Sequence, residues 1–360
     1  MLERISLFLK AVDDFVWGVP LIVLILTTGV FLTFRLRGVQ FRRLGTACRY
    51  MFQNEEDGHG EVSSFAALCT ALSATIGTGN IVGVATAIVS GGAGALFWMW
   101  IAALFGMATK YAEGVLAIKY RVIGEDGHVL GGPFYYIENG MGKQFRWLGK
   151  IFAFFGAGVG LLGIGTFTQV NGITSAAGDF FDKNKEHVIS LFGREYSLAV
   201  IITGIILTVC VAMVVLGGIR RIARVSEIIV PFMAVFYVAS CLCILFLNAE
   251  KIPAAFAEIL ESAFGLRAMA GGALGTILLS MQKGIARGIF SNEAGLGSAP
   301  IAAAAAQTKE PARQGLVSMT GTFIDTIVVC TMTGLCIVLT GSHRLGLEGV
   351  AVTTNAFQTG

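Results

Sequence analysis

The stretch Ser73-Ala74-Thr75-Ile76-Gly77-Thr78-Gly79-Asn80-Ile81-Val82-Gly83 decides the fold class, because it lies inside the longest uncharged run of the chain. No Asp, Glu, Lys or Arg occurs from residue 62 to residue 109. This run is more than twice the ~20 residues that a helix needs to cross a bilayer. Two glycines one residue apart, next to Thr and Asn, are poor material for a continuous helix. We therefore expect a membrane helix that is interrupted near its centre.

The composition is typical of a protein that crosses a membrane several times. Of the 360 residues, 55% are hydrophobic and 14% are charged, and the mean hydropathy is +0.74. Soluble proteins carry about 25% charged residues. The net charge of +3 and the lack of a basic stripe with aromatic residues argue against a nucleic-acid partner. The seven cysteines contain no CxxC pair, and we interpret them as small apolar residues.

Charge-free runs predict eight crossings, counting two in the run from 62 to 109. The other runs are 15–34, 151–178, 196–219, 228–249, 268–308 with charges near its middle, and 314–342 with Asp325 as its single charge. The first run is too long for a signal peptide and should stay in the mature chain. Loops after the odd-numbered crossings carry most of the Lys and Arg residues. This asymmetry predicts that those loops are cytoplasmic and that the N-terminus is outside.

A second polar, glycine-interrupted segment runs from Gly284 to Pro300. By the loop charges it crosses the membrane in the opposite direction to the segment at 73–83. A pair of broken helices in inverted orientation is the best sequence signal for a transporter site at the middle of the bilayer. The alternative is that the glycines only form close helix-packing faces.

The chemistry of such a site follows from the broken backbone. Free N–H groups near Thr78 and Gly79, at the start of a half-helix, suit a carboxylate. Backbone carbonyls near Ser73, Thr75 and Ile76 can bind a small cation, and the side-chain oxygens of Thr75, Asn80, Ser291 and Asn292 can complete its shell. These groups suit a zwitterionic amino acid that enters with sodium.

Several motifs resemble one known family. GTGNIVGVATAI at 77–88 and FSNEAGLGSAP at 290–300 resemble the two signature stretches of the alanine or glycine:cation symporter family, the sodium-coupled amino acid carriers of bacteria and archaea. GALFWMWIAALFGMATKYAE at 94–113, GGPFYYIENGMG at 131–142, ESAFG at 261–265 and FIDTIVVCT at 323–331 resemble the family as well. The resemblance therefore runs over nearly the whole chain and implies a carrier in a plasma membrane.

The resemblance implies a LeuT-like, all-α membrane fold in which an extra N-terminal helix precedes two inverted five-helix repeats. Residues 1–60 would hold that helix and a basic cytoplasmic segment, and 61–249 the first repeat. Residues 250–360 would hold an outer interfacial segment and the first two helices of the second repeat. Because three helices of that repeat are missing, we expect a truncated sequence or a natural fragment, and cation ligands from those helices are not assigned.

The family motifs also assign the site. They place substrate contacts at Thr75, Gly77, Thr78, Gly79 and Asn80 in the first broken helix, and at Phe290, Ser291, Asn292 and Gly295 in the second. Gln169 resembles the substrate-contacting glutamine of the family, and Thr166, one turn earlier, would face the same way. The alternative for Gln169 is a bond to a neighbouring helix alone. Sodium would bind through Ser73, Thr75, Ile76, Asn80 and Ser291.

Other charged residues have simpler explanations. We expect Lys110 and Glu113 to form an i,i+3 pair that reaches the cytoplasmic interface. Lys283 and Arg287 need acidic partners, for which Glu293 and Asp325 are candidates, although Asp325 is also a candidate cation ligand. A basic stretch from Arg35 to Arg49 either lies on the inner membrane surface or is an ordinary cytoplasmic loop.

Three other functions compete with symport. A membrane enzyme is disfavoured because no GxSxG or HExxH motif occurs, and we expect no organic cofactor, only sodium as coupling ion. A channel is harder to exclude, because broken helices also build ion filters. A LeuT-like permease with another substrate or coupling ion is the nearest alternative.

Overall fold

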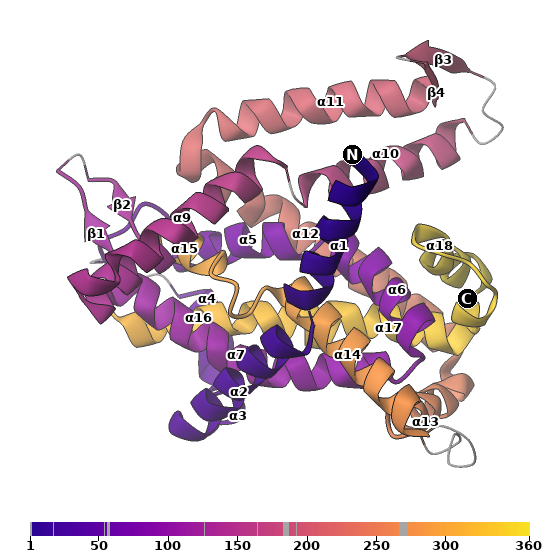
Figure 1. Ribbon diagram of the computed structural model, residues 1–360, viewed down its shortest axis with the longest axis horizontal. Helices are drawn as coiled ribbons and strands as arrows, with labels where there is room; N and C mark the ends of the chain where they lie inside the picture. The colour runs from indigo at the N-terminus through magenta and orange to yellow at the C-terminus, as the bar shows by residue number, and fades with distance from the viewer. Residues whose placement is uncertain are drawn as a thin grey trace.

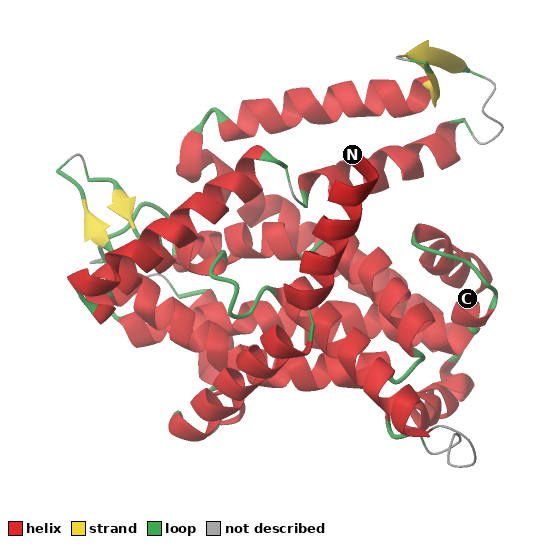
Figure 2. Ribbon diagram, in the orientation of Figure 1, coloured by secondary structure: helices red, strands yellow, loops and turns green. Residues whose placement is uncertain are grey.

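The computed structural model describes residues 2–16, 18–53, 55, 58–125, 127–163, 165–182, 187–191, 193–265 and 273–360. Helices form most of this structure, and two short strand hairpins lie at its edges (Figure 2). In the hairpins β1 (Val122–Ile123) pairs with β2 (Val129–Leu130), and β3 (Val188–Leu191) pairs with β4 (Arg194–Ser197), both antiparallel. The expectation of an all-α chain is confirmed at this coarse level.

The helices follow one another in a fixed order along the chain. The α-helices are α1 (Leu2–Val16), α2 (Val19–Arg35), α3 (Val39–Arg42), α4 (Leu44–Met51), α5 (Ser64–Thr75), α6 (Val84–Gly91), α7 (Ala95–Lys119), α8 (Pro133–Tyr136), α9 (Arg146–Leu161), α10 (Thr166–Phe181), α11 (Leu198–Val215), α12 (Gly218–Leu247), α13 (Ile252–Ala263), α14 (Ala273–Asn292), α15 (Ala299–Ala304), α16 (Pro311–Thr322), α17 (Thr331–Thr340) and α18 (Val350–Thr359). Three segments of the described chain are π-helical: η1 (Gly79–Gly83) lies between α5 and α6, η2 (Ile137–Met141) follows α8, and η5 (Phe323–Cys330) lies between α16 and α17.

Fewer helices meet a strict test for membrane spans than the eight that were predicted. Within the described residues, five helical stretches are long and apolar enough, or six if the bent pair at 64–91 counts as one span. The first predicted crossing is only the 17-residue α2, because the helix is interrupted before Val19. The fourth is one of the five, Lys143–Phe181, but within it α9 and α10 are separated near Gly163 and Gly165, whose φ angles are positive at 62° and 87°. α14, which carries Lys283 and Arg287, is not one of the five stretches that are long and apolar enough to cross a membrane.

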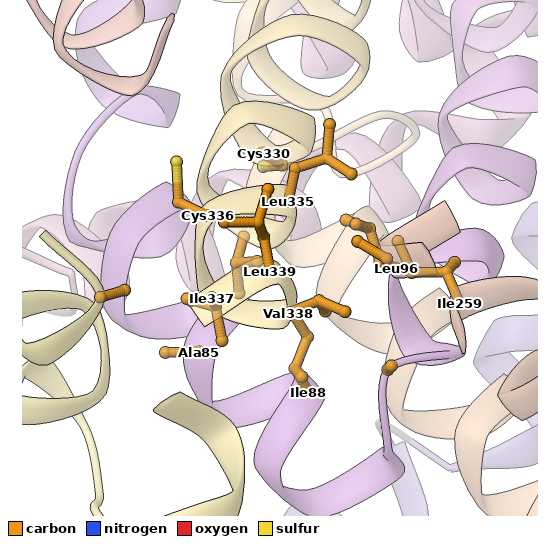
Figure 3. Close-up of a cluster of buried hydrophobic side chains, with 14 of the residues drawn as sticks. Ala85, Ile88, Leu96, Ile259, Cys330, Leu335, Cys336, Ile337, Val338 and Leu339 are labelled. Carbon is orange, nitrogen blue, oxygen red and sulfur yellow. The ribbon is translucent and has the colours of Figure 1, made fainter. Parts of the chain in front are cut away.

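The core of the molecule lies where α6, α7, α13 and α17 meet. Leu96 of α7, Ile88 of α6 and Ile259 of α13 are almost completely buried against Ile337 and Val338 of α17 (Figure 3). Of the most apolar stretch of α7, 61% of the residues are buried. This packing fixes α7, which carries Lys110 and Glu113, and the helix from α16 to α17, which carries Asp325 and Thr326.

One part of the chain extends away from this core. α10, β3, β4 and α11 form a long hairpin at the top of Figure 1, and α10 and α11 contact each other. The most apolar stretch of α11 has no buried residue at all. A helix with this much exposed apolar surface is typical of one that faces lipid or other membrane helices.

Candidate functional site

The first predicted break is confirmed. α5 ends at Thr75, Ile76 is extended with φ −77° and ψ 111°, and the helix resumes at Gly79, so the two halves are inclined at 53°. Ser63 caps the start of α5 by accepting a hydrogen bond from the Ala66 N–H at 3.0 Å. Thr78, Gly79 and Asn80 therefore lie at the start of a half-helix, as expected.

The second break is also present, but it begins later than the glycine pattern indicates. α14 continues as a regular helix through Ser291 to Asn292, and the interruption covers residues 293–298. Glu293, Gly295 and Gly297 have positive φ angles of 53°, 88° and 81°, which no helix accommodates. The earlier glycines of this segment, Gly284 and Gly288, instead let α14 approach the backbone of α7 closely. They are packing glycines, as the alternative interpretation proposed.

A buried polar cluster joins the two broken helices to the helix of Asp325. The Asn80 Nδ2 donates to Asp325 Oδ1 at 2.7 Å and lies 3.2 Å from Ser291 Oγ. The Ser291 hydroxyl donates to Asp325 Oδ2 at 2.9 Å. All three side chains are at most 2% exposed. The structure thus brings Asn80 and Ser291 together as predicted, and identifies Asp325 as the group between them.

A second set of contacts extends this cluster. Thr326 Oγ1 donates to Asp325 Oδ2 at 2.8 Å and accepts from Asn292 Nδ2 at 3.0 Å, while the Asn292 Oδ1 accepts the Ala294 N–H at 3.0 Å. Asp325 and Thr326 lie in η5, and π-helical turns are frequent at functional sites. Thr326 was missed in the sequence, where its only signal was its place beside Asp325.

The backbone amides at the first break are held by side-chain oxygens. The Gly77 N–H donates to Asn80 Oδ1 at 2.8 Å, and the Thr78 N–H donates to Gln169 Oε1 at 2.9 Å. A Cβ at Gly77 would lie 2.6 Å from Gln169 Nε2, whereas one at Gly79 would meet nothing within 4 Å. The Gln169 oxygen therefore binds the amide that was predicted to bind a substrate carboxylate.

The remaining predicted residues are divided between the site and its surroundings. Thr75 and Ile76 are buried at the end of α5, and Gly295 lies in the second break. Ser73 is exposed, and its hydroxyl donates to the Thr70 carbonyl at 2.7 Å, so its side chain is turned away from the cluster. Thr166 is exposed in the first turn of α10, and Phe290 is 47% exposed. The structure does not bring these last two side chains to the cluster.

The interpretation of Lys110 and Glu113 as an interfacial pair is wrong. Their exposed fractions are 3% and 7%, so both are buried inside the helix bundle. The Glu113 Oε1 accepts the Gly297 N–H at 3.1 Å, and Glu113 thereby holds the second broken segment. Lys110 interacts electrostatically with both Glu113 and Asp325. A cavity of about 20 Å³, the size of one water or small ion, is lined by Lys110, Thr75 and Asn292.

The acidic partners suggested for Lys283 and Arg287 are also wrong. Glu293 accepts a hydrogen bond from the Ser298 hydroxyl, and Asp325 belongs to the cluster with Asn80. In the part of the chain that the structure describes, no ion pair joins these two basic side chains to Glu293 or Asp325. The Arg287 guanidinium lies 5.3 Å from the centre of the Phe290 ring, a cation–π contact.

At one end of the site the two broken helices are tied together, and we call this contact the clasp. It consists of residues 58–62, residues 304–308 and Arg121. The Arg121 guanidinium donates to the carbonyls of Ala304, Ala306 and Thr308 at 2.7 Å each, and to that of His59. Val62 and Ala306 form a parallel bridge, in which the Gln307 N–H donates to the Val62 carbonyl at 2.7 Å.

Glu61, one of the clasp residues, is bound by three residues that lie beside the clasp. Its carboxylate accepts the Val129 N–H at 2.9 Å and lies 3.3 Å from His128 and 3.4 Å from Arg220. Burial opposes ionisation of Glu61, but the Val129 hydrogen bond and these two basic groups outweigh it and lower the pKa of the carboxyl.

Comparison with known proteins gives a consistent result. Residues 2–360 match the model of the sodium:alanine symporter family. The chain is 56% identical to an uncharacterized transporter of Haemophilus influenzae, over 99% of this chain and 75% of that protein. It is 49% identical to the sodium/alanine symporter AgcS of Methanococcus maripaludis, over 97% of this chain and 74% of AgcS. It is 39% identical to a probable sodium/glutamine symporter, GlnT, of Bacillus subtilis, over 95% of this chain and 67% of GlnT.

The match covers both broken helices, η5 and the helices that hold them. The family assignment expected from the motifs at 77–88 and 290–300 is therefore confirmed, and with it the expectation of a membrane transporter. The chain belongs to the sodium:alanine symporter family.

Proposed function

We propose that this chain is a sodium-coupled symporter that takes up a small neutral amino acid by alternating access within a LeuT-like fold, as a multi-pass protein of a bacterial or archaeal plasma membrane. The observation that carries the proposal is the buried cluster of Asn80, Ser291 and Asp325, in which two broken helices meet one carboxylate. Interrupted helices that converge on a buried polar centre are the usual site of such transporters.

The charges of the interior favour a monovalent cation at this cluster. Among the described residues around the two breaks, the buried charged residues are Lys110, Glu113 and Asp325, and their formal charges sum to −1. The Glu61 side chain is enclosed as well, but in the clasp, where His128 and Arg220 lie beside its carboxylate. One sodium ion beside Asp325 would neutralise this excess. Its ligands would be an Asp325 oxygen, the hydroxyl oxygens of Ser291 and Thr326, the side-chain oxygen of Asn80 and backbone carbonyls near Thr75 and Ile76. Hard oxygen ligands of this kind suit small cations.

The amino acid would bind next to this ion. Its carboxylate would replace Gln169 Oε1 at the Thr78 N–H and use the open space at Gly79, while the freed Gln169 amide could donate to the same carboxylate. The half-helix that starts there adds a favourable dipole. In this arrangement binding of ion and substrate would both reorganise the first break, which gives a physical basis for coupling.

Labelled-alanine uptake into proteoliposomes tests the proposal. Symport predicts saturable uptake that requires an inward sodium gradient, whereas uptake driven equally by a proton gradient alone would contradict sodium coupling. Flux that does not saturate would favour a channel. The relative GlnT makes glutamine a second candidate cargo, so competition by unlabelled alanine, glycine and glutamine separates the substrates.

A further inference from the structure

The basic stretch at Arg35–Arg49 lines a cavity that the proposed transport cycle does not use. This cavity has a volume of about 360 Å³ and lies between the end of α2, α3 and α4 on one side and α7 and α16 on the other. Volumes of 300–1,000 Å³ are typical of small-molecule sites. It is separate from the cluster around Asp325, with which it shares no lining residue.

The polar side of this cavity is positively charged. Arg42, Arg43 and Arg313 line it together with one acid, Glu310, which leaves two positive charges in excess. Arg313 is fixed in place, because its Nη2 donates to the Gln53 carbonyl at 2.6 Å and its guanidinium stacks 4.8 Å from the centre of the Tyr50 ring.

The two other guanidiniums are available to a ligand. Arg42 and Arg43 are exposed, and neither guanidinium makes a hydrogen bond or an ion pair with any residue in the described ranges, although both backbones are bonded within the helices. Arginine presents a planar fork of donors that matches the oxygens of phosphate and carboxylate groups. The cavity therefore has the donor set of an anion site.

The apolar side of the cavity indicates where the anion comes from. Leu36, Val39 and Leu316 line it, and it begins directly after the apolar helix α2. Phe34 and Phe41, beside it in the sequence, are 78% and 64% exposed. Basic and aromatic residues at the end of an apolar helix are typical of the membrane interface, where anionic lipid headgroups lie.

We propose that this cavity binds the phosphate headgroup of an anionic phospholipid, with Arg42 and Arg43 on the phosphate oxygens and the acyl chains along Phe34 and Phe41. This inference depends on membrane placement and not on the proposed symport. α16, which forms one wall, continues into η5, which carries Asp325. A bound lipid would thus rest on the same helix as the proposed sodium ligand.

Native mass spectrometry of the purified full chain, titrated with phosphatidylglycerol or phosphatidylcholine, tests the proposal. We expect the wild type to prefer phosphatidylglycerol. The double variant Arg42→Gln/Arg43→Gln should bind it at least about tenfold more weakly, because it removes both guanidiniums that would bind the phosphate oxygens. The matched control is Arg35→Gln/Arg49→Gln, which removes two exposed charges of the same stretch from outside the cavity.

Three results would overturn the proposal. Equal losses in both double variants would indicate general charge attraction, and equal binding of the two lipids by the wild type would indicate no headgroup site. Displacement of the lipid by millimolar inorganic phosphate would indicate a site for soluble anions. The two wild-type measurements decide the question even if a variant fails to fold, and none of them requires transport.

Discussion

Replacing Asp325 by Asn tests the proposed sodium site most directly, because it removes one charge and almost no volume. Asp325 is 1% exposed and accepts hydrogen bonds from Asn80, Ser291 and Thr326 at 2.7, 2.9 and 2.8 Å. The Thr326 and Ser291 hydroxyls can rotate to meet a carboxamide, so we expect the variant to fold.

The expected loss follows from Coulomb's law. Two unit charges about 4 Å apart interact by about 4 kcal/mol at an effective dielectric constant of 20. The cost of desolvating the carboxylate offsets part of this attraction, so we expect the variant to lose about 2 kcal/mol of sodium-binding free energy. This loss corresponds to about thirtyfold weaker sodium binding. The sodium concentration for half-maximal alanine uptake should rise by the same factor.

Thermal unfolding gives a second readout that does not require transport. A ligand that binds only the folded state stabilises it by about 2.7 kcal/mol at 100 times its dissociation constant. Sodium should therefore raise the unfolding temperature of the wild type and of the control Asp179→Asn, an exposed acid on α10, but hardly that of Asp325→Asn. A variant whose sodium dependence stays within twofold of the wild type, in uptake and in unfolding, would refute the assignment of Asp325 as a ligand.

Four further predictions concern the first break and the clasp. Gly77→Ala should weaken alanine binding by about tenfold, or about 1.4 kcal/mol, because the new Cβ would displace Gln169. Gly79→Leu should leave the free energy of unfolding unchanged yet abolish alanine binding. Isothermal titration that finds normal affinity in either variant would contradict the site. Arg121→Lys should lower the free energy of unfolding by about 2 kcal/mol in chemical denaturation, since an ammonium cannot reach four carbonyls; an unchanged value would show that these contacts contribute little. Glu61→Gln should have a lower free energy of unfolding than the wild type above pH 4.5, the ordinary pKa of the carboxyl. This difference should vanish as pH falls through the lower pKa of Glu61 in the folded state. A difference that persists in acid would be inconsistent with the ion pairs.

The first break could be predicted because it is encoded locally. Gly77 and Gly79 carry little helix propensity, and Asn80 has a side chain that can replace a backbone partner for the Gly77 N–H. The second break was predicted in the right segment but too early. Gly284 and Gly288 weaken a helix in isolation, but close packing on α7 compensates for this, and packing cannot be read from one segment.

The buried charges show a different limit of sequence analysis. The spacing of Lys110 and Glu113 is the same whether the pair faces water or the interior, so the choice depends on which side of α7 the other helices cover. The pairing of Glu113 with the Gly297 amide connects residues 184 positions apart. Asp325 was recognisable as the single charge of its apolar run, but its partners Asn80 and Ser291 come from two other helices.

The clasp has a mechanical consequence. Because Arg121 and the Val62–Ala306 bridge tie the start of α5 to the end of α15, we expect these two half-helices to move together about the two breaks, at residues 76–79 and 293–298. Half-helices tied in this way would not turn about one break while the other stays still. Each such movement would therefore change both halves of the binding centre at the same time. An ion that bound without the amino acid would then find no partly open path across the membrane.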